Sequence, residues 1–338
     1  MKRSHVLDES ERAAKGAVER TKRGLSRRQV LAGGAMAASA LPLVDSFSPR
    51  LGAAQARRRG PQGGRGPIKV LLITQFHAFD RAPFYDMFDS FGEEITWTHV
   101  DRPAANVFFD PDVAKPWDVF ITFGAFGGRV RKPKPGGGFE NVDTEPSEEL
   151  KQGTKALLQQ GKGIVFLHHS ISSWVHTWPE WVEIMGAAAD WGKPLKNIRG
   201  KEFPRSGYRQ GVEQHISVVD KEHPIVQGLG DGFDIVDEPY LCPVFEDSVH
   251  PILRSDFEPI DSNFPKLYER GWRHPKGSNL AGWVKTAEKS PIAYIQPGHD
   301  RVGWENESYR TLVMNAMRWA ASEEALAWAA DNPTKIFK

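Results

Sequence analysis

The stretch IKVLLITQ, from Ile68 to Gln75, decides the fold of this 338-residue chain. It is short and almost wholly apolar, as expected of a parallel β-strand that is buried on both faces. Similar apolar runs follow it along the chain: ITWTHV (95–100), WDVFITFG (117–124) and GIVFLHH (163–169). Helical patterns are found at 82–91, 148–161 and 178–186. Strands that alternate with helices predict an α/β fold with a doubly wound, mostly parallel sheet.

The regular alternation weakens after about Gly186. Four further runs read as strands with shorter connections, and the helical pattern at 307–322 follows them; the runs are HISVVD (215–220), FDIVDEPY (233–240), HPILRSD (250–256) and SPIAYIQPG (290–298). This predicts an irregular, partly antiparallel extension of the sheet. Two stretches without periodicity remain. Residues 129–146 are expected to form a solvated loop or a flap over the site, and residues 190–211 could wall the pocket.

The N-terminus has the pattern of an export signal. Arg27 and Arg28 precede a Gly/Ala-rich apolar run, and Ala54-Gln55-Ala56 reads as a small-residue cleavage site. We therefore expect a twin-arginine signal peptide at 1–56, a disordered tether at 57–67, one domain at 68–325 and a C-terminal tail at 326–338. The mature protein is expected to be periplasmic or otherwise extracytoplasmic, and to meet a membrane only through this signal.

Charge and cysteine content exclude two classes of protein. The leader holds 10 of the 44 Lys/Arg and 5 of the 43 Asp/Glu residues, so the remainder is mildly acidic and has no nucleic-acid footprint. Cys242 is the one cysteine, which rules out an internal disulfide and makes a cysteine-dependent glutaminase very improbable. The Gly-rich FGAFGG (123–128) lacks the dinucleotide-binding spacing, so no nucleotide cofactor is expected.

Residues with acid–base chemistry follow four of the expected strands. In doubly wound sheets ligands bind outside the carboxyl ends of the strands, so these residues form the candidate site. They are Gln75 and His77, His168 and His169, Asp237 and Glu238, and His299 and Asp300. One such residue alone would be a weak signal, but four sequence-distant segments together predict a reaction site or a recognition site.

Roles follow from side-chain chemistry. Histidine titrates near neutrality and a carboxylate can orient it, so the expected catalytic residues are His168, Glu238, His299 and Asp300. An aromatic ring offers contact area to the apolar face of a sugar. The expected substrate-binding residues are therefore Trp174 and Trp304, together with Gln75, His77, His169 and Asp237. Alternatively, His77, His168 and His299 could hold a divalent metal such as zinc with an open coordination position.

At this point the sequence resembles a known family. PGHDRVGWENESYRTLVMNAMRWA (297–320) resembles the C-terminal signature of the trehalose-utilisation (ThuA-like) family, as do KEHPIVQGL (221–229) with FDIVDEPY, and ALLQQGKGIVFLHHS (156–170). The resemblance covers roughly residues 68–322. It implies a class I glutamine amidotransferase-like fold with a flavodoxin-like core and without the catalytic cysteine. It also implies a role in the metabolism of disaccharides or their keto derivatives, through His168, Asp237-Glu238 and His299-Asp300.

Three functions stay open on the sequence. The first is an exported carbohydrate-active enzyme, a hydrolase, lyase or isomerase, that works by His/carboxylate acid–base chemistry. The second is a non-catalytic sugar-binding protein that keeps the pocket. The third is a metal-dependent hydrolase. In each case the expected partner is a small carbohydrate, and assembly into a homo-oligomer is left open.

Overall fold

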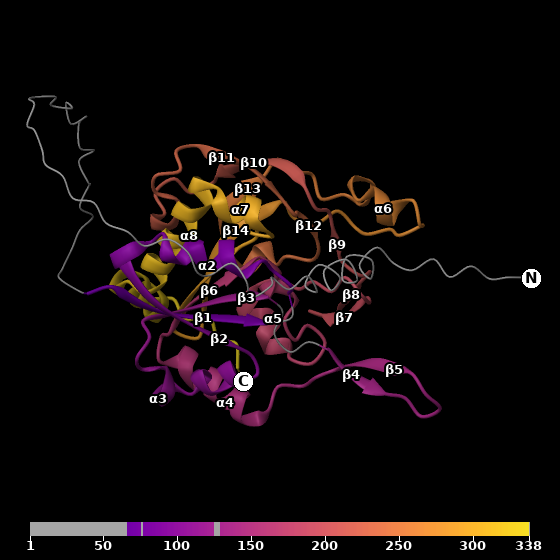
Figure 1. Ribbon diagram of the computed structural model, residues 1–338, viewed down its shortest axis with the longest axis horizontal. Coiled ribbons are helices and arrows are strands. Elements are labelled where there is room, and N and C mark those ends of the chain that lie inside the picture. The colour runs from indigo at the N-terminus through magenta and orange to yellow at the C-terminus, as the bar shows by residue number, and fades with distance from the viewer. Residues whose placement is uncertain (1–65, 76, 125–128, 338) are drawn as a thin grey trace, which may run out of the picture. The chain divides into compact units, whose positions relative to one another are not determined.

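The computed structural model describes residues 66–75, 77–124 and 129–337. A nine-stranded sheet runs through this part of the chain (Figure 1). Its order is β11 (Gly232–Asp237), β10 (Val212–Val218), β13 (His250–Ser255), β14 (Leu280–Ala287), β15 (Ser290–Ile295), β6 (Gly163–Leu167), β3 (Val119–Gly124), β1 (Ile68–Gln75) and β2 (Ile95–Asp101). The predicted leader at 1–56, and all but residues 66 and 67 of the predicted tether, lie outside the described residues.

The sheet has a parallel half and an antiparallel half. The strands from β2 to β15 pair in parallel, and the strands from β15 to β11 pair antiparallel. This confirms the predicted doubly wound sheet with an antiparallel extension. Because the antiparallel strands alternate in direction, β11 again points the same way as β1, β6 and β15. The carboxyl ends of these four strands therefore lie at one edge of the sheet.

Successive residues of β1 belong to two different apolar cores. Val70 and Leu72 pack into one core, and Leu71 and Ile73 pack into the other. The first core includes residues of α2 (Arg81–Asp89), α7 (Arg301–Glu305), α8 (Glu307–Ala320) and α9 (Glu323–Asp331). The second includes residues of the 3-10 helix η3 (Ala104–Phe109), α4 (Glu148–Gln159), η4 (His168–Ser172) and α5 (Pro179–Met185). Side chains alternate across a strand, so a strand that is apolar at every position requires cover on both faces.

Shorter elements occupy the connections. The helices are α3 (Pro111–Ala114) and α6 (Pro265–Tyr268), with 3-10 turns η2 (Gly92–Glu94), η5 (Pro224–Val226), η6 (Glu246–Ser248) and η7 (Asp261–Asn263). Three two-stranded pairs complete the described part: β4 (Arg129–Pro133) with β5 (Phe139–Asp143), β7 (Leu195–Ile198) with β8 (Lys201–Phe203), and β9 (Gly207–Tyr208) with β12 (Tyr240–Leu241). None of the helices in the described ranges is long and apolar enough to cross a membrane.

Several segments differ from their sequence-based expectation. The stretch 129–146, expected to be a loop, contains the β4–β5 hairpin, which extends away from the main sheet (Figure 1). The stretch 190–211 is not structureless, since it contains β7, β8 and β9. The boundary expected at residue 325 falls inside α9, and the buried Phe337 packs into the second core. The chain after residue 325 is thus part of the domain, because its apolar side chains cover the sheet.

Candidate functional site

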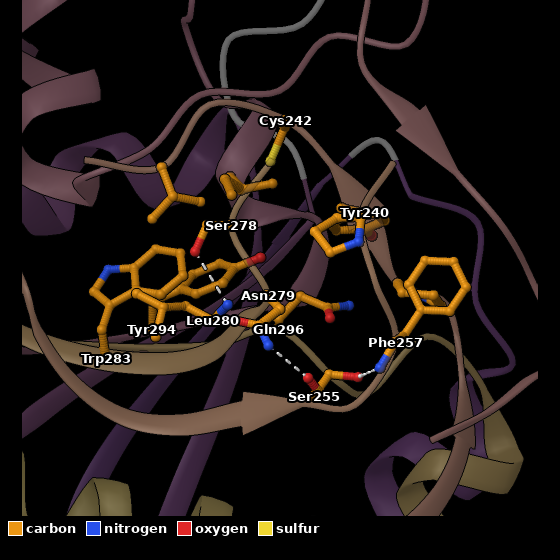
Figure 2. A pocket seen from close by; sticks show the side chains of 14 residues that line it. Tyr240, Cys242, Ser255, Phe257, Ser278, Asn279, Leu280, Trp283, Tyr294 and Gln296 are labelled. Carbon is orange, nitrogen blue, oxygen red and sulfur yellow. Dashed lines mark hydrogen bonds between the residues drawn. The ribbon is translucent and has the colours of Figure 1, made fainter. Parts of the chain in front are cut away.

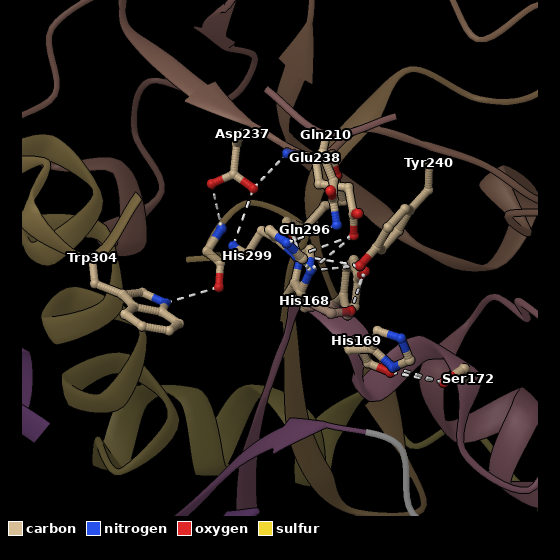
Figure 3. Close-up of polar contacts among 12 residues, drawn as sticks. His168, His169, Ser172, Gln210, Asp237, Glu238, Tyr240, Gln296, His299 and Trp304 are labelled. Carbon is tan, nitrogen blue, oxygen red and sulfur yellow. Dashed lines mark hydrogen bonds and ion pairs between the residues drawn. The ribbon is translucent and has the colours of Figure 1, made fainter. Parts of the chain in front are cut away.

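Four strand ends deliver their polar residues to one place. His168 directly follows β6, and His299 lies four residues after the end of β15. Nε2 of His168 is 3.1 Å from Nδ1 of His299. The carboxylate of Glu238, just after β11, lies 3.4 Å from His168 and 3.2 Å from His299 (Figure 3). The ring of His77, after β1, has its centroid 5.7 Å from that of His168 and 5.2 Å from that of His299. The predicted meeting of these residues is confirmed.

His168 occupies a strained turn between β6 and η4. Its φ of 46° lies in the left-handed region, which a non-glycine residue adopts only when its surroundings hold it there. Tyr294 donates a hydrogen bond to its carbonyl oxygen at 2.8 Å, and its Nδ1 lies 2.8 Å from the carbonyl oxygen of Gln296. A carbonyl can only accept, so Nδ1 carries a proton. The lone pair of neutral His168 is therefore on Nε2, where the Tyr240 hydroxyl approaches to 2.6 Å.

Glu238 and His299 shift each other's pKa. Burial by itself would raise the pKa of Glu238, whose side chain is 4% exposed, but the adjacent imidazoles of His168 and His299 bring that pKa below its ordinary value. Burial would likewise lower the pKa of His299, yet the hydrogen bond to Glu238 outweighs it and leaves the pKa raised. Glu238 is therefore placed to accept a hydrogen bond from Nδ1–H of His299 and to stabilise the imidazolium whenever that ring takes a second proton. Nε2 of His299, on the far side of the ring, lies 3.2 Å from Nε2 of Gln210.

The neighbouring histidines are kept neutral. Burial, followed by the imidazoles of His168 and His299, lowers the pKa of His77 from 6.5 to about 3. Burial also lowers the pKa of His169 well below its ordinary value, and Nδ1 of His169 lies 3.1 Å from the Ser172 hydroxyl. Both rings can therefore donate or accept hydrogen bonds near neutral pH but carry no charge there.

Three histidines are spaced to hold a metal ion. One nitrogen from each of His77, His168 and His299 lies within 4.8 Å of the other two. The bond from Nδ1–H of His168 to a backbone carbonyl is the kind of outer contact that orients metal-binding imidazoles. Neutral imidazole is the form that binds zinc, so these residues fit such an ion.

A cavity of about 280 Å³ opens beside Glu238 and His299. It is lined by His77, His169, Trp191, Tyr208, Gln210, Glu238 and His299. Its size is close to the lower end of the range for small-molecule sites. The stretch 190–211 supplies three of the lining residues, as the sequence suggested it could. Sequence reasoning did not single out Trp191, Tyr208 or Gln210, and no spacing or periodicity in that stretch marks them.

Asp237, predicted to bind substrate, anchors the loop that carries His299 and does not line the cavity. It is buried, and its two carboxylate oxygens accept hydrogen bonds from the backbone N–H groups of Glu238 (2.7 Å), Gly298 (2.8 Å) and His299 (3.1 Å) (Figure 3). Its acceptors are thus turned to the backbone and not to the cavity. Asp237 is a positioning residue for His299.

The expected catalytic pair of His299 and Asp300 is also corrected. Asp300 is exposed and caps α7, with its carboxylate accepting a hydrogen bond from the backbone N–H of Val302 at 2.9 Å. It does not line the cavity. The carboxylate partner of His299 is Glu238, which lies 61 residues earlier in the sequence. Gln75 is half-buried at the end of β1, and its side chain does not line the cavity either.

Both tryptophans predicted to contact substrate lie in the core. Trp304 is 1% exposed, and its Nε1–H donates to the carbonyl oxygen of Gly298 at 2.8 Å. Trp174 is 4% exposed and packs against Trp178 and Trp181. Neither ring lines the cavity, because Trp304 packs into the first core and Trp174 into the second.

A second, much smaller cavity of about 20 Å³ lies among buried side chains that include Tyr240, Tyr294 and Gln296 (Figure 2). Tyr240, Tyr294 and Gln296, which all contact His168, line it together with the buried Cys242. A space of this size accommodates one water molecule. No histidine or charged side chain lines it, so it is not the reaction site.

Comparison with known proteins agrees with this architecture. Residues 88–320 match the family model described as ThuA, trehalose utilisation. A ThuA-like protein from Parabacteroides merdae has 17% identity and a TM-score of 0.54 over 76% of this chain and 90% of its own. Another from Bacteroides uniformis has 17% identity and a TM-score of 0.52 over 78% and 95%. No curated protein matches. The chain belongs to the ThuA (trehalose utilisation) family.

Proposed function

We propose that this protein is a carbohydrate-active enzyme that transfers a proton at a ketone-bearing sugar derived from a disaccharide such as trehalose. The single observation that carries the proposal is the Glu238–His299 contact of 3.2 Å at the wall of a cavity of small-molecule size. A carboxylate that holds one nitrogen of an imidazole leaves the other nitrogen to take or give a proton. Membership in the trehalose-utilisation family supports a sugar as the ligand.

The carboxylates favour proton transfer over hydrolysis of an unmodified glycoside. Glycosidases generally use two carboxyl groups on opposite sides of the glycosidic bond. Of the three carboxylates predicted for the site, Asp237 is bound to the backbone and Asp300 caps a helix, so only Glu238 lines the cavity among the described residues. A ketone acidifies the neighbouring C–H bond, and one imidazole base then suffices for the reaction.

Each residue of the cluster has a distinct role in this proposal. His299 takes the proton from the carbon beside the ketone through Nε2. Glu238 holds Nδ1–H of the same ring and stabilises the imidazolium that forms. His168, fixed by Gln296 and Tyr240, packs against His299 and keeps its ring in place.

Deuterium exchange tests the proposal. The protein is incubated in D₂O with trehalose that has been oxidised to a ketone on one ring, and loss of the proton beside the ketone is followed by NMR. We expect wild-type exchange to be catalysed, and His299→Gln to slow it about 100-fold or more. His215→Gln is the matched control, because that ring is 47% exposed on β10, paired with Asp234, and does not line the cavity. Wild-type rates in His299→Gln and Glu238→Gln would refute the proposal, and saturable binding without exchange would favour a sugar-binding protein.

Metal-assisted hydrolysis is a second candidate function, favoured by the three histidine nitrogens that lie within 4.8 Å of one another. A zinc ion bound there would supply a polarising charge or an activated water. Elemental analysis of protein purified without chelators, followed by zinc titration calorimetry, tests this candidate. About one equivalent of bound metal per chain, lost in His77→Gln, would support metal-assisted hydrolysis. Less than a tenth of an equivalent with no measurable zinc binding, together with deuterium exchange that persists in EDTA, contradicts it.

We place the reaction outside the cytoplasm on the strength of the leader predicted at 1–56. Replacement of Arg27 and Arg28 by lysine in a fusion to a folded reporter should retain the reporter in the cytoplasm. Export that is unaffected by both replacements would refute this assignment.

A further inference from the structure

We propose that Trp191 and Tyr208 form a binding subsite for the sugar ring that does not react. This inference rests on the proposed function in one respect, namely that the ligand is a carbohydrate of two rings. The subsite faces the same cavity as the reacting groups and is built from the stretch 190–211, which is separate in sequence from the segments that carry His77, His168, Glu238 and His299.

The cavity has two chemically different sides. His77, Glu238 and His299 bring the acid–base groups, whereas Trp191 and Tyr208 bring aromatic rings. The two rings meet edge to face, with centroids 6.2 Å apart and planes at 85°. Pockets for small molecules commonly combine aromatic walls with a few polar groups that fix orientation. A pyranose presents an apolar C–H face to such a ring and hydroxyl groups around its rim.

Trp191 is held rigidly before any ligand arrives. Its ring packs on those of His169, at a centroid distance of 4.2 Å, and Tyr240, at 5.1 Å. The buried Asp190 accepts hydrogen bonds from the two residues that follow Trp191, at 2.7 and 3.1 Å, and pairs with His176 at 2.6 Å. A wall that is ordered in advance loses little conformational entropy on binding.

Three groups that line the cavity are available to a ligand: two buried nitrogens without a hydrogen-bond partner among the described residues, and one exposed ring. Nε1–H of Trp191 is buried and has no hydrogen-bond partner among the described residues, although buried indole N–H groups usually find one. Nδ1 of His77, which also lines the cavity, likewise has no hydrogen-bond partner among the described residues. Tyr208 is 46% exposed, which is unusual for a large ring that already lies beside other aromatic residues. A sugar ring covers Tyr208, and its hydroxyl groups offer partners to such nitrogens.

The size of the cavity assigns the two rings to different places. A volume of about 280 Å³ suits one sugar ring, so the ketone-bearing ring lies inside, beside His299 and Glu238. The second ring then lies toward the mouth, on the exposed face of Tyr208 and the edge of Trp191. Gln210, which is exposed and lies with Nε2 3.2 Å from Nε2 of His299, also lines the cavity.

Binding and kinetics of single variants test the subsite. Titration calorimetry with trehalose itself, and exchange kinetics with keto-trehalose, are measured for wild type, Trp191→Ala, Trp191→Phe and Tyr208→Ala. We expect each alanine variant to raise Kd and KM about tenfold, with kcat within about threefold of wild type, and Trp191→Phe to recover most of the loss. The effect should be small for a keto-glucose monosaccharide. Trp328→Ala is the matched control, since this tryptophan is 36% exposed on α9 and does not line the cavity.

The outcomes separate the subsite from the reaction. Any of three outcomes would overturn the subsite. The first is a wild-type Kd and KM in both alanine variants, and the second is a fall in kcat with an unchanged KM. The third is that the wild-type protein binds neither disaccharide saturably. Should His299→Gln leave exchange unchanged while Trp191→Ala weakens trehalose binding, the proposed reaction fails and the subsite stands. Thermal melting checks that each variant folds, and Tyr208→Ala, which removes an exposed ring, carries the test if Trp191→Ala does not fold.

Discussion

Replacement of Asp237 by asparagine should destabilise the fold and misplace His299. The Asp237 carboxylate accepts three backbone hydrogen bonds at 2.7, 2.8 and 3.1 Å, and two of them come from Gly298 and His299. These bonds join the end of β11 to the loop after β15. An asparagine has the same shape, but one of its two oxygen positions becomes an NH₂ group that faces a backbone N–H.

The magnitude follows from the bonds that are lost. A hydrogen bond to a charged group contributes about 1.5–3 kcal/mol, and an unsatisfied buried donor costs about 1–3 kcal/mol. Removal of a buried negative charge offsets part of this, because burial raises the pKa of Asp237 and so disfavours its charged form. We expect a net loss of about 2 kcal/mol in the free energy of unfolding. Exchange at the keto-sugar should fall as well, since His299 loses its backbone anchor.

Urea unfolding at pH 7, monitored by tryptophan fluorescence, measures the loss. Asp234→Asn is the matched control, because this residue lies on the same strand with its side chain 89% exposed and an ion pair to His215. That control should change stability by less than about 0.5 kcal/mol. If Asp237→Asn is as stable as Asp234→Asn and exchanges at the wild-type rate, then Asp237 does not hold the loop and the reasoning fails.

Three further predictions concern other parts of the molecule. Burial lowers the pKa of His223 from 6.5 to about 4, and Nδ1 of this ring accepts a hydrogen bond from a backbone N–H of η5. Between these two pH values the unfolded chain therefore binds more protons than the folded chain does. The stability that is present above pH 6.5 is lost as the pH falls toward 4. With allowance for the partly exposed ring, His223→Asn should reduce the loss of unfolding free energy between pH 7 and pH 5 by about 1–2 kcal/mol, and an unchanged pH dependence would contradict this. Burial raises the pKa of the Cys242 thiol to about 12, so iodoacetamide at pH 8 should modify the urea-unfolded protein but not the native one, as read by mass spectrometry; rapid alkylation of native protein would contradict its burial. Gly298→Ala would place a Cβ atom against the Tyr309 hydroxyl at a φ of 114°, and should lower the free energy of unfolding by about 3 kcal/mol or more. Gly271→Ala is the control, since its φ is 81° and no atom lies within 4 Å of the new Cβ, so only backbone strain is added. Equal melting temperatures of the two variants would show that the overlap with Tyr309 is relieved.

The strand ends were predictable because the rule behind them is local. Four apolar runs end in polar residues, and parallel strands of a doubly wound sheet end at the same edge. The pattern was therefore enough to bring His77, His168, Glu238 and His299 together. It was not enough to separate Glu238 from Asp237, because adjacent residues after a strand point in different directions and the sequence does not say which of them faces the backbone.

The tryptophans show where residue type alone misleads. Trp174 and Trp304 follow the site strands closely in sequence, but their rings fill the core. Trp191 lies in a stretch without periodicity, far from any expected strand, and yet its ring lines the cavity. Proximity in sequence to a site strand does not decide this, because a side chain faces the cavity only when the loop that carries it folds back over the sheet edge.

The sequence by itself determined the α/β class, the mostly parallel sheet, the edge at which the site forms and most of its histidines. These follow from the spacing of apolar residues and from the chirality and direction of a parallel sheet, which are properties of short segments. Only the tertiary structure decided that His299 pairs with Glu238 instead of Asp300, that Asp237 serves the backbone, and that Trp191 and Tyr208 close the cavity. Those choices depend on which donors and rings remain without a partner after every segment has packed, and no single segment contains that information.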